Sequence, residues 1–206
     1  MKTKNKALLL SLCAVLLVAA SVLGTMAYLT SQDAVTNTFS VGSVAISMDE
    51  LDVDNSTEGE NDRDKANNYK LLPGHQYTKD PIVHVSSTSE DCYLFVKVVN
   101  EITAIEDATT VADQMEKKGW IAVDGAENIY VYVGTTEGAS APLAVAANSN
   151  ITVFESFKVK GSVTNEELAN YADKTITVTA YAVQKDGFEN ETAANIWNTA
   201  FNASAQ

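Results

Sequence analysis

The amino-acid sequence predicts a mainly β protein: an antiparallel β-sandwich with two or three short helices, preceded by an N-terminal signal peptide helix. Apolar residues make up 46% and charged residues 20% of the 206 residues, which is typical of a folded globular domain. β-Branched and aromatic residues recur in short runs that are separated by turn residues. Helical patterns do not alternate regularly with these runs, which argues against a parallel α/β sheet.

The first 27 residues have the pattern of an export signal. Three lysines come first, at Lys2, Lys4 and Lys6. An uncharged run over residues 7–23 follows, and small residues then stand at the −3 and −1 positions of a cleavage site between Ala27 and Tyr28. We expect cleavage there. An uncleaved signal anchor is the alternative, because the run is nearly long enough to span a bilayer.

This site predicts three parts: a signal peptide (1–27), an N-terminal segment (28–40) and a β-sandwich domain (41–206). Cleavage removes three of the 14 basic residues and none of the 27 acidic ones, so the net charge changes from −13 to −16. Such acidity excludes a nucleic-acid partner, since binding phosphates needs a basic face. Contact with a membrane is expected only through the uncleaved signal. We also expect divalent cations or lowered pH to favour association of the mature chains, because either would reduce the repulsion between their negative charges.

Seven segments of the mature chain are expected to be strands, because each is rich in β-branched or aromatic residues and several alternate in polarity. They cover residues 41–48, 76–85, 93–99, 120–123, 129–133, 151–159 and 175–183. Asp124-Gly125 predicts a hairpin between the fourth and fifth of these strands.

The two or three short helices are expected at residues 109–118 and 164–171, with 192–201 as the third. The first should end at Gly119, with lysines in its last turn. Thr164 and Glu167 have the spacing of a capping box at the start of the second. Ile196 and Trp197 lie on the apolar side of the third.

An acidic loop over residues 49–64 is the best candidate for a metal site. Asp52, Asp54 and Ser56 stand at alternate positions, as the first ligands of a calcium loop do. However, Thr57 occupies the glycine position of such a loop, and Arg63 occupies its closing position, where a carboxylate is needed. A solvated loop is therefore preferred, and weakly bound calcium is the alternative. No other cofactor is expected.

No catalytic residues are predicted, and the chain is not expected to be an enzyme. His75 and His84 are the two histidines, and they form no H-E-x-x-H motif. A G-x-S-x-G motif is also absent. Cys92, the one cysteine left after cleavage, has no identifiable histidine partner. We expect a buried, inert thiol there, and an intermolecular cross-link is the alternative.

Several stretches together resemble one family of exported proteins. They are TMAYLT (25–30), NTFSVGSV (37–44), LLPG (71–74) with Lys79 following, DCYLFVKV (91–98), and VTAYAVQ (178–184) with Trp197 after it. Their order and spacing are similar to those of the SipW-dependent proteins, the TasA/camelysin family. The resemblance covers nearly the whole chain.

The resemblance implies a jelly-roll-like sandwich, secreted by a Gram-positive bacterium to the extracellular matrix or cell surface. It implies processing by the dedicated signal peptidase SipW and self-association into biofilm fibres, with other matrix proteins as further partners. In such fibres the N-terminal segment of one subunit adds as a strand to the next, where it pairs with an exposed sheet edge. Residues 28–40 would be the donor, with Phe39, Val41 and Val44 as apolar anchors.

Two other functions remain open. The first is a monomeric surface module that binds calcium through the acidic loop, or a glycan through Tyr130 and Tyr132. These tyrosines share one face of a strand, where packing into the core is favoured over exposure. The second is a camelysin-like secreted peptidase, for which the sequence offers no supporting residues.

Overall fold

The computed structural model describes residues 3–28, 42–55 and 62–202, and the chain divides into two compact units, Met1–Ser40 and Val41–Gln206. The described part of the first unit is one helix, α1 (Thr3–Tyr28). Ala27 and Tyr28, which flank the predicted cleavage site, are its last two residues. A search of the described helices found none that is long and apolar enough to cross a membrane.

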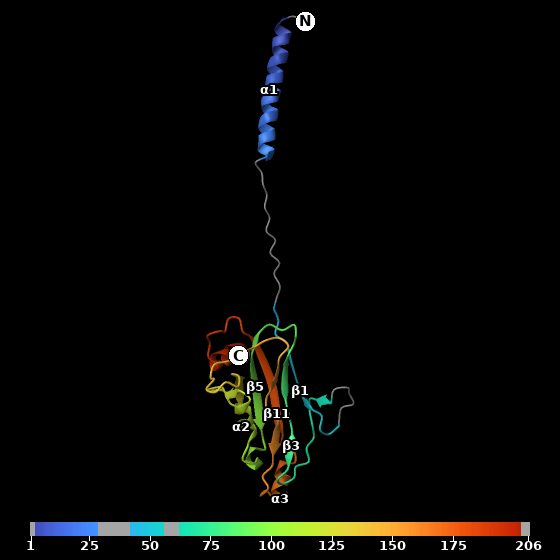
Figure 1. Cartoon of the computed structure of the whole chain (residues 1–206), viewed down its shortest axis with the longest axis vertical. Coiled ribbons are helices and arrows are strands. Elements are labelled where there is room, and N and C mark those ends of the chain that lie inside the picture. The colour runs from blue at the N-terminus through green and yellow to red at the C-terminus, as the bar shows by residue number, and fades with distance from the viewer. Residues whose placement is uncertain (1–2, 29–41, 56–61, 203–206) are drawn as a thin grey trace. The chain divides into compact units, whose positions relative to one another are not determined.

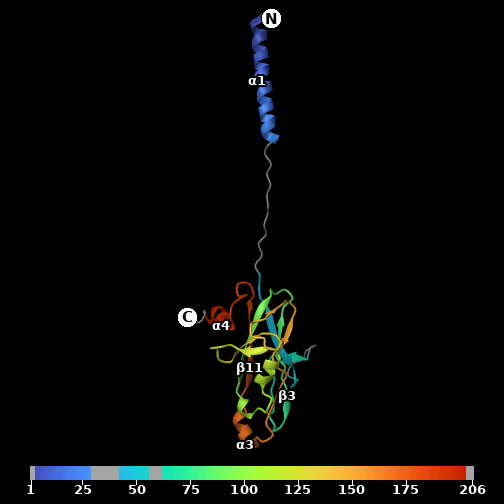
Figure 2. The ribbon, with the colours of Figure 1, turned by 60° about the vertical axis from the view of Figure 1, so that its left-hand side comes forward.

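The second unit is mainly β, and its strands pair antiparallel (Figures 1 and 2). Its strands are β1 (Ile46–Leu51), β2 (Arg63–Asp64), β3 (Gln76–Thr78), β4 (Ile82–Val85), β5 (Cys92–Asn100), β6 (Trp120–Ala122), β7 (Ile129–Tyr132), β8 (Ala144–Val145), β9 (Asn150–Thr152), β10 (Ser156–Lys158) and β11 (Ile176–Gln184). The predicted mainly β, antiparallel fold is confirmed.

The strands form three sheets. One has the order β2-β1-β4-β9, the second pairs β10 with β3, and the third has the order β11-β5-β7-β6 with β8 beside β5. Strands β5 and β11 pair along all nine residues of each and run side by side through the domain (Figure 1). The predicted hairpin is also present, with β6 and β7 as its two strands.

Strand β5 is buried on both of its faces. Leu94 and Val96 belong to a core that also includes Val83 and Val85 of β4, so the first and third sheets share this core. On the opposite face, Phe95 packs in a second core with Trp197 of the C-terminal helix.

Short helices punctuate the sheets. They are α2 (Val111–Lys117), α3 (Asn165–Leu168) and α4 (Ala193–Trp197), with the 3₁₀ turns η1 (Thr103–Ile105) and η2 (Ala169–Tyr171) and the π-helical turn η3 (Asn198–Asn202). α3 and α4 lie at opposite ends of the domain (Figure 2). Thr164 and Glu167 form the predicted capping box of α3, and Gly119 follows α2 with φ +86°.

Two predicted strands are each divided in two. Residues 76–85 form β3 and β4, which pair with β10 and β9 respectively, so both segments change sheets at the same place. Pro81 stands at the change in the first segment and lacks the N–H that a continuous strand would need. The first predicted strand, 41–48, is shifted, because regular pairing begins only at Ile46 and continues to Leu51.

Candidate functional site

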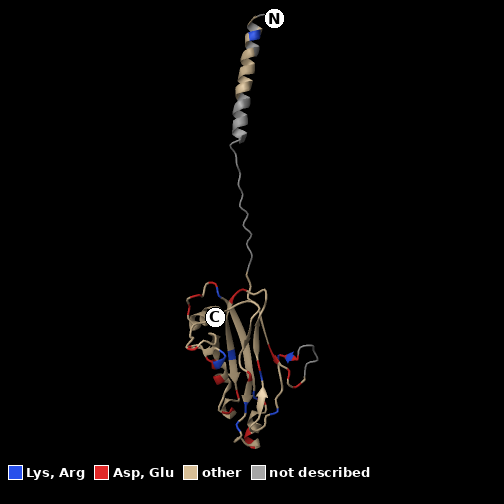
Figure 3. Cartoon of the chain, viewed as in Figure 1, with Lys and Arg blue, Asp and Glu red and all other residues tan. Residues whose placement is uncertain are grey.

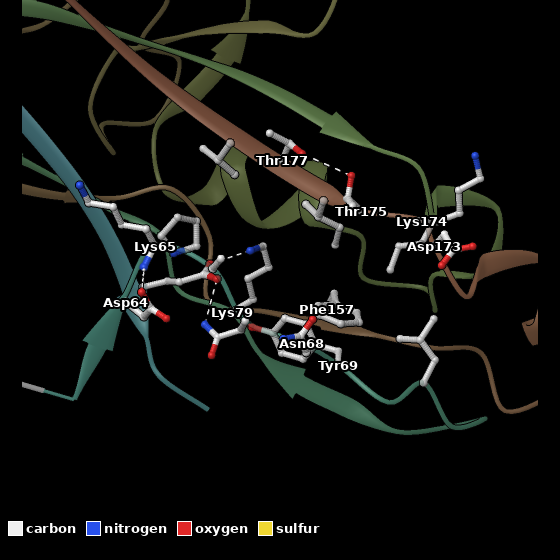
Figure 4. A pocket seen from close by; sticks show the side chains of 18 of the residues that line it. Asp64, Lys65, Asn68, Tyr69, Lys79, Phe157, Asp173, Lys174, Thr175 and Thr177 are labelled. Atoms are coloured by element: carbon white, nitrogen blue, oxygen red, sulfur yellow. Dashed lines mark hydrogen bonds and ion pairs between the residues drawn. The ribbon is translucent and has the colours of Figure 1, made fainter. Parts of the chain in front are cut away.

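A groove of about 710 Å³ lies between the first and third sheets of the second unit. One wall is built by β1, through residues 48–50, and by the segment that follows β2. The opposite wall is the start of β11, together with the turn at residues 171–175 that leads into it. Figure 4 shows Thr175, just before β11, and Thr177, on β11, across the groove from Asp64 and Lys65. One wall therefore comes from β1, beyond which only the two-residue β2 is paired, and the other comes from β11, the outermost strand of the third sheet.

The strand on each side of the groove has an edge without a strand partner. Among the described strands, β11 pairs only with β5. Strand β1 pairs with β4 over Ile46–Asp49, and its other side pairs with β2 only at Glu50 and Leu51. Backbone N–H and C=O groups at such edges are available to another extended segment. The groove is thus bordered by two strand edges.

The groove has an apolar floor and a mixed polar rim. Phe157 is buried below it, and the Tyr69 ring packs edge-on against Phe157 at 5.2 Å between centroids. Ile102 is also buried in the lining, while Ile176 and Val178 are half-buried. An extended segment with alternating apolar side chains fits these properties, since one face would enter the groove and its backbone would meet a sheet edge.

A polar cluster around the buried Glu50 closes the β1 side of the groove. Lys79 Nζ lies 2.6 Å from Glu50 Oε2, and Asn67 Nδ2 donates to Glu50 Oε1 at 2.9 Å. Sequence reasoning missed this cluster and placed Glu50 in a solvated loop. Glu50 lies two residues beyond Met48 and four beyond Ile46, so the period-2 pattern of the strand could have predicted that it faces inward.

Both ends of the predicted acidic loop belong to strands. Asp49 and Glu50 belong to β1, and Arg63 and Asp64 form β2 against it. Arg63 contacts the Asp49 carboxylate, and its Nη1 lies 3.0 Å from Asp80 Oδ2. The one basic residue of the loop therefore holds two carboxylates at its base. Acidic residues are otherwise spread over the surface of the domain (Figure 3).

His84 extends this network across the first sheet. Its Nε2 lies 3.0 Å from Asp49 Oδ1, and its Nδ1 lies 2.7 Å from Asn150 Oδ1. Both ring nitrogens face oxygen acceptors, which favours the imidazolium form. Burial opposes the charge, but the hydrogen bonds to Asp49 and Asn150 outweigh it and raise the pKa of His84. Burial likewise opposes the charge of Asp49, and the bonds from Arg63 and His84 lower its pKa.

The calcium candidates are placed as follows. Asp52 and Asp54 follow β1, and Ser56 lies outside the described residues. Asp54 Oδ2 accepts hydrogen bonds from the Asn68 backbone N–H at 2.7 Å and from its side chain at 3.1 Å. Within the described ranges, no three or more His, Cys, Asp or Glu side chains are grouped so that they could hold a metal ion.

The structure also places the cysteine, the second histidine and the two tyrosines that the sequence analysis considered. Cys92 is fully buried, as expected, and its burial, followed by the nearby Asp91, raises the pKa of the thiol to about 11. His75 is exposed, with its ring 5.2 Å from that of Tyr77. Tyr130 and Tyr132 are half-buried against the shared core, as the packing interpretation predicted.

The predicted anchor residues of the N-terminal segment are only partly covered by the structure. Phe39 and Val41 lie outside the described residues. Val44 is half-buried and packs against the core of its own domain. A donated strand would therefore have to end before Val44.

Comparisons of the chain with family models, with curated proteins and with solved structures found no match.

Proposed function

We propose that this chain is a secreted structural subunit of an extracellular fibre or cell-surface layer, of the TasA/camelysin type. Signal cleavage after Ala27 would free residues 28–40, which would add as a strand to the groove of the next subunit. The domain itself would then have the jelly-roll-like arrangement that the sequence resemblance implies. No catalytic group takes part in this function.

The observation that carries this proposal is the groove between the β1 and β11 edges. A strand that enters it could pair with the start of β11, whose residues 176–178 line the groove and which has no second strand partner among the described residues. Apolar side chains on the inward face of this strand would cover the floor at Phe157 and Val178. Backbone pairing would supply affinity and side-chain packing would supply specificity.

The length and composition of the donor agree with this acceptor. Residues 28–40 contain no lysine or arginine and a single acidic residue, Asp33, so little charge would be buried. Phe39 and Val41 alternate on one face of an extended segment. The contact is head-to-tail, and such a contact propagates into a filament when it does not close into a ring.

Truncation of the donor tests the proposal. The chain that begins at Tyr28 should form filaments visible by electron microscopy, and the chain that begins at Val41 should stay monomeric at the same concentration. A synthetic peptide of residues 28–40 should bind the truncated chain and should stop growth of the longer one. A peptide with the same composition in scrambled order is the matched control.

Equal behaviour of the two chains would contradict strand donation. If both stay monomeric, the monomeric surface-binding function becomes the better interpretation. If both polymerise, the acceptor surface is used by something other than residues 28–40.

A further inference from the structure

Three side chains of complementary reactivity meet at the β1 side of the groove: an amine, a carboxylate and a carboxamide. Glu50 is on β1, Asn67 follows β2, and Lys79 follows β3. The Glu50 carboxylate holds both of the others, with Oε2 at 2.6 Å from Lys79 Nζ and Oε1 at 2.9 Å from Asn67 Nδ2. One carboxyl group therefore places the amine and the amide side by side.

The burial of this cluster distinguishes it from the other lysine pairs of the described chain. The side chains of Lys79 and Glu50 are 12% and 6% exposed. In the remaining lysine–carboxylate pairs every side chain is at least 34% exposed; they are Lys118–Glu155, Lys158–Asp107 and Lys174–Glu101. Lys79 Nζ also lies 6.0 Å from the centre of the Tyr69 ring. Because water has little access, the attraction between these two groups is screened less than in a surface pair.

The amide of Asn67 is held for attack on its carbon. Its Oδ1 accepts a hydrogen bond from the Val53 backbone N–H at 2.7 Å. Its Nδ2 donates both to Glu50 and to the Leu51 carbonyl, the latter at 2.8 Å. An N–H group aimed at a carbonyl oxygen stabilises the negative charge that develops there when a nucleophile adds. Lysine amines are effective nucleophiles once they are desolvated and deprotonated.

We propose that Lys79 and Asn67 form an intramolecular isopeptide bond, with Glu50 carrying the protons. One proton passes from Nζ to Glu50, and the neutral amine forms a bond to Asn67 Cγ while the Val53 N–H holds the oxyanion. The Cγ–Nδ2 bond then breaks. Of the two protons that Nζ gives up, Glu50 delivers one to Nδ2, and the departing ammonia takes up the other as ammonium. No electrons are transferred and no co-reactant is needed.

The bond would join the segment after β2 covalently to the segment between β3 and β4. Both segments belong to the β1 wall of the groove, so the link would fasten this wall against pulling forces along a fibre. The reaction itself needs only the folded domain. It does not depend on whether the chain polymerises.

Mass spectrometry of the full, folded chain tests the proposal. After incubation at neutral pH, the mass should fall by one ammonia. Trypsin should then leave residues 66–70 joined to residues 71–97, because the modified Lys79 resists cleavage. A succinimide at Asn67 would also lose ammonia, but it would release residues 66–70 as a separate peptide. That outcome, or an unchanged mass, would overturn the proposal.

Matched variants assign the roles. Lys79→Arg and Asn67→Ala should abolish the joined peptide. Glu50→Gln should slow its formation by at least tenfold while the far-ultraviolet circular dichroism stays that of the parent chain. Asn68→Ala removes the neighbouring amide, which bonds to Asp54 instead, and Lys174→Arg alters an exposed pair. Both should leave the link intact, and loss of the link in either would show that the wrong groups were assigned.

Discussion

Strands β5 and β11 have the same length, pair with each other along every residue, and differ in what surrounds them. β5 lies between β11 on one side and β7 and β8 on the other, and both of its faces are buried. β11 has β5 on one side and the groove on the other, and most of its side chains are half-buried or exposed. The same local structure therefore lies at the centre of the fold in one strand and borders the groove, the proposed assembly surface, in the other.

Two valines that face each other across these strands measure the difference directly. Val98 on β5 is 5% exposed, and Val178, its partner on β11, is half-buried. Val98→Ala should lower the free energy of unfolding by about 2–3 kcal/mol, since it removes two buried methyl groups and leaves a cavity. Val178→Ala should cost about 1 kcal/mol, because part of its surface already faces solvent. Urea denaturation measures both, and equal losses would contradict the contrast between the strands.

The sequence could predict what β5 and β11 share, namely that both segments are strands. The β-branched and aromatic content of residues 93–99 and 175–183 indicated that both segments are strands. Whether a strand is central or outermost depends on which other strands pair with it. Those partners are distant in sequence, so local patterning contains no signal for them.

The same reason explains what was missed in the candidate site. The inward position of Glu50 follows from alternation along β1, but its two partners lie 17 and 29 residues further along the chain. Asn67 stands in a polar stretch without periodicity, and Lys79 precedes a proline-containing turn. Only the tertiary fold brings these residues to one carboxylate.

On the β1 side of the groove, the attachment of β2 to β1 can be weakened by one substitution. Arg63 holds β2 against β1 through Asp49 and Asp80, whose side chains are 31% and 23% exposed. Arg63→Ala should lower the free energy of unfolding by about 1 kcal/mol, since it leaves two partly buried carboxylates without their cation and solvent screens part of the loss. Lys174→Ala, which breaks an exposed pair with Glu101, is the control and should change it by less than about 0.5 kcal/mol. If Arg63→Ala lowers the free energy of unfolding no more than the control does, the contacts of Arg63 with Asp49 and Asp80 contribute nothing to stability.

The free energy of unfolding should depend on pH through His84, which lies on β4 of the first sheet. Its pKa is raised in the folded state by the hydrogen bonds to Asp49 and Asn150, against the effect of burial. Its contribution is therefore complete below the unfolded pKa of about 6.5 and is lost as the pH rises through the folded value. We expect a loss of about 0.5 kcal/mol between pH 6 and pH 8 in thermal or urea unfolding.

A pair of histidine variants separates this effect from others. His84→Gln should remove the pH dependence in that range, and His75→Gln, in the exposed turn, should preserve it. Asp49 contributes in the opposite direction at acid pH: its pKa is lowered, so its stabilisation is present above about pH 4 and is lost as the pH falls below that value. Retention of the dependence in His84→Gln would assign it to another group.

The smallest effect on folding should accompany the largest effect on assembly. Thr177 is exposed on β11 and lines the groove, so Thr177→Lys should change the free energy of unfolding by less than about 0.5 kcal/mol. A lysine on a strand edge discourages the addition of another strand, because its charge would have to be buried or displaced. The chain that begins at Tyr28 should therefore stop forming filaments when it carries this substitution.

Ala122→Lys adds the same charge to β6, the outermost strand on the opposite side of the same sheet, and should leave filament formation unchanged. Light scattering and electron microscopy on the two variants compare the two edges at equal net charge. Inhibition by Ala122→Lys alone would move the acceptor from β11 to β6, and inhibition by both would point to repulsion between subunits instead of a strand-pairing edge.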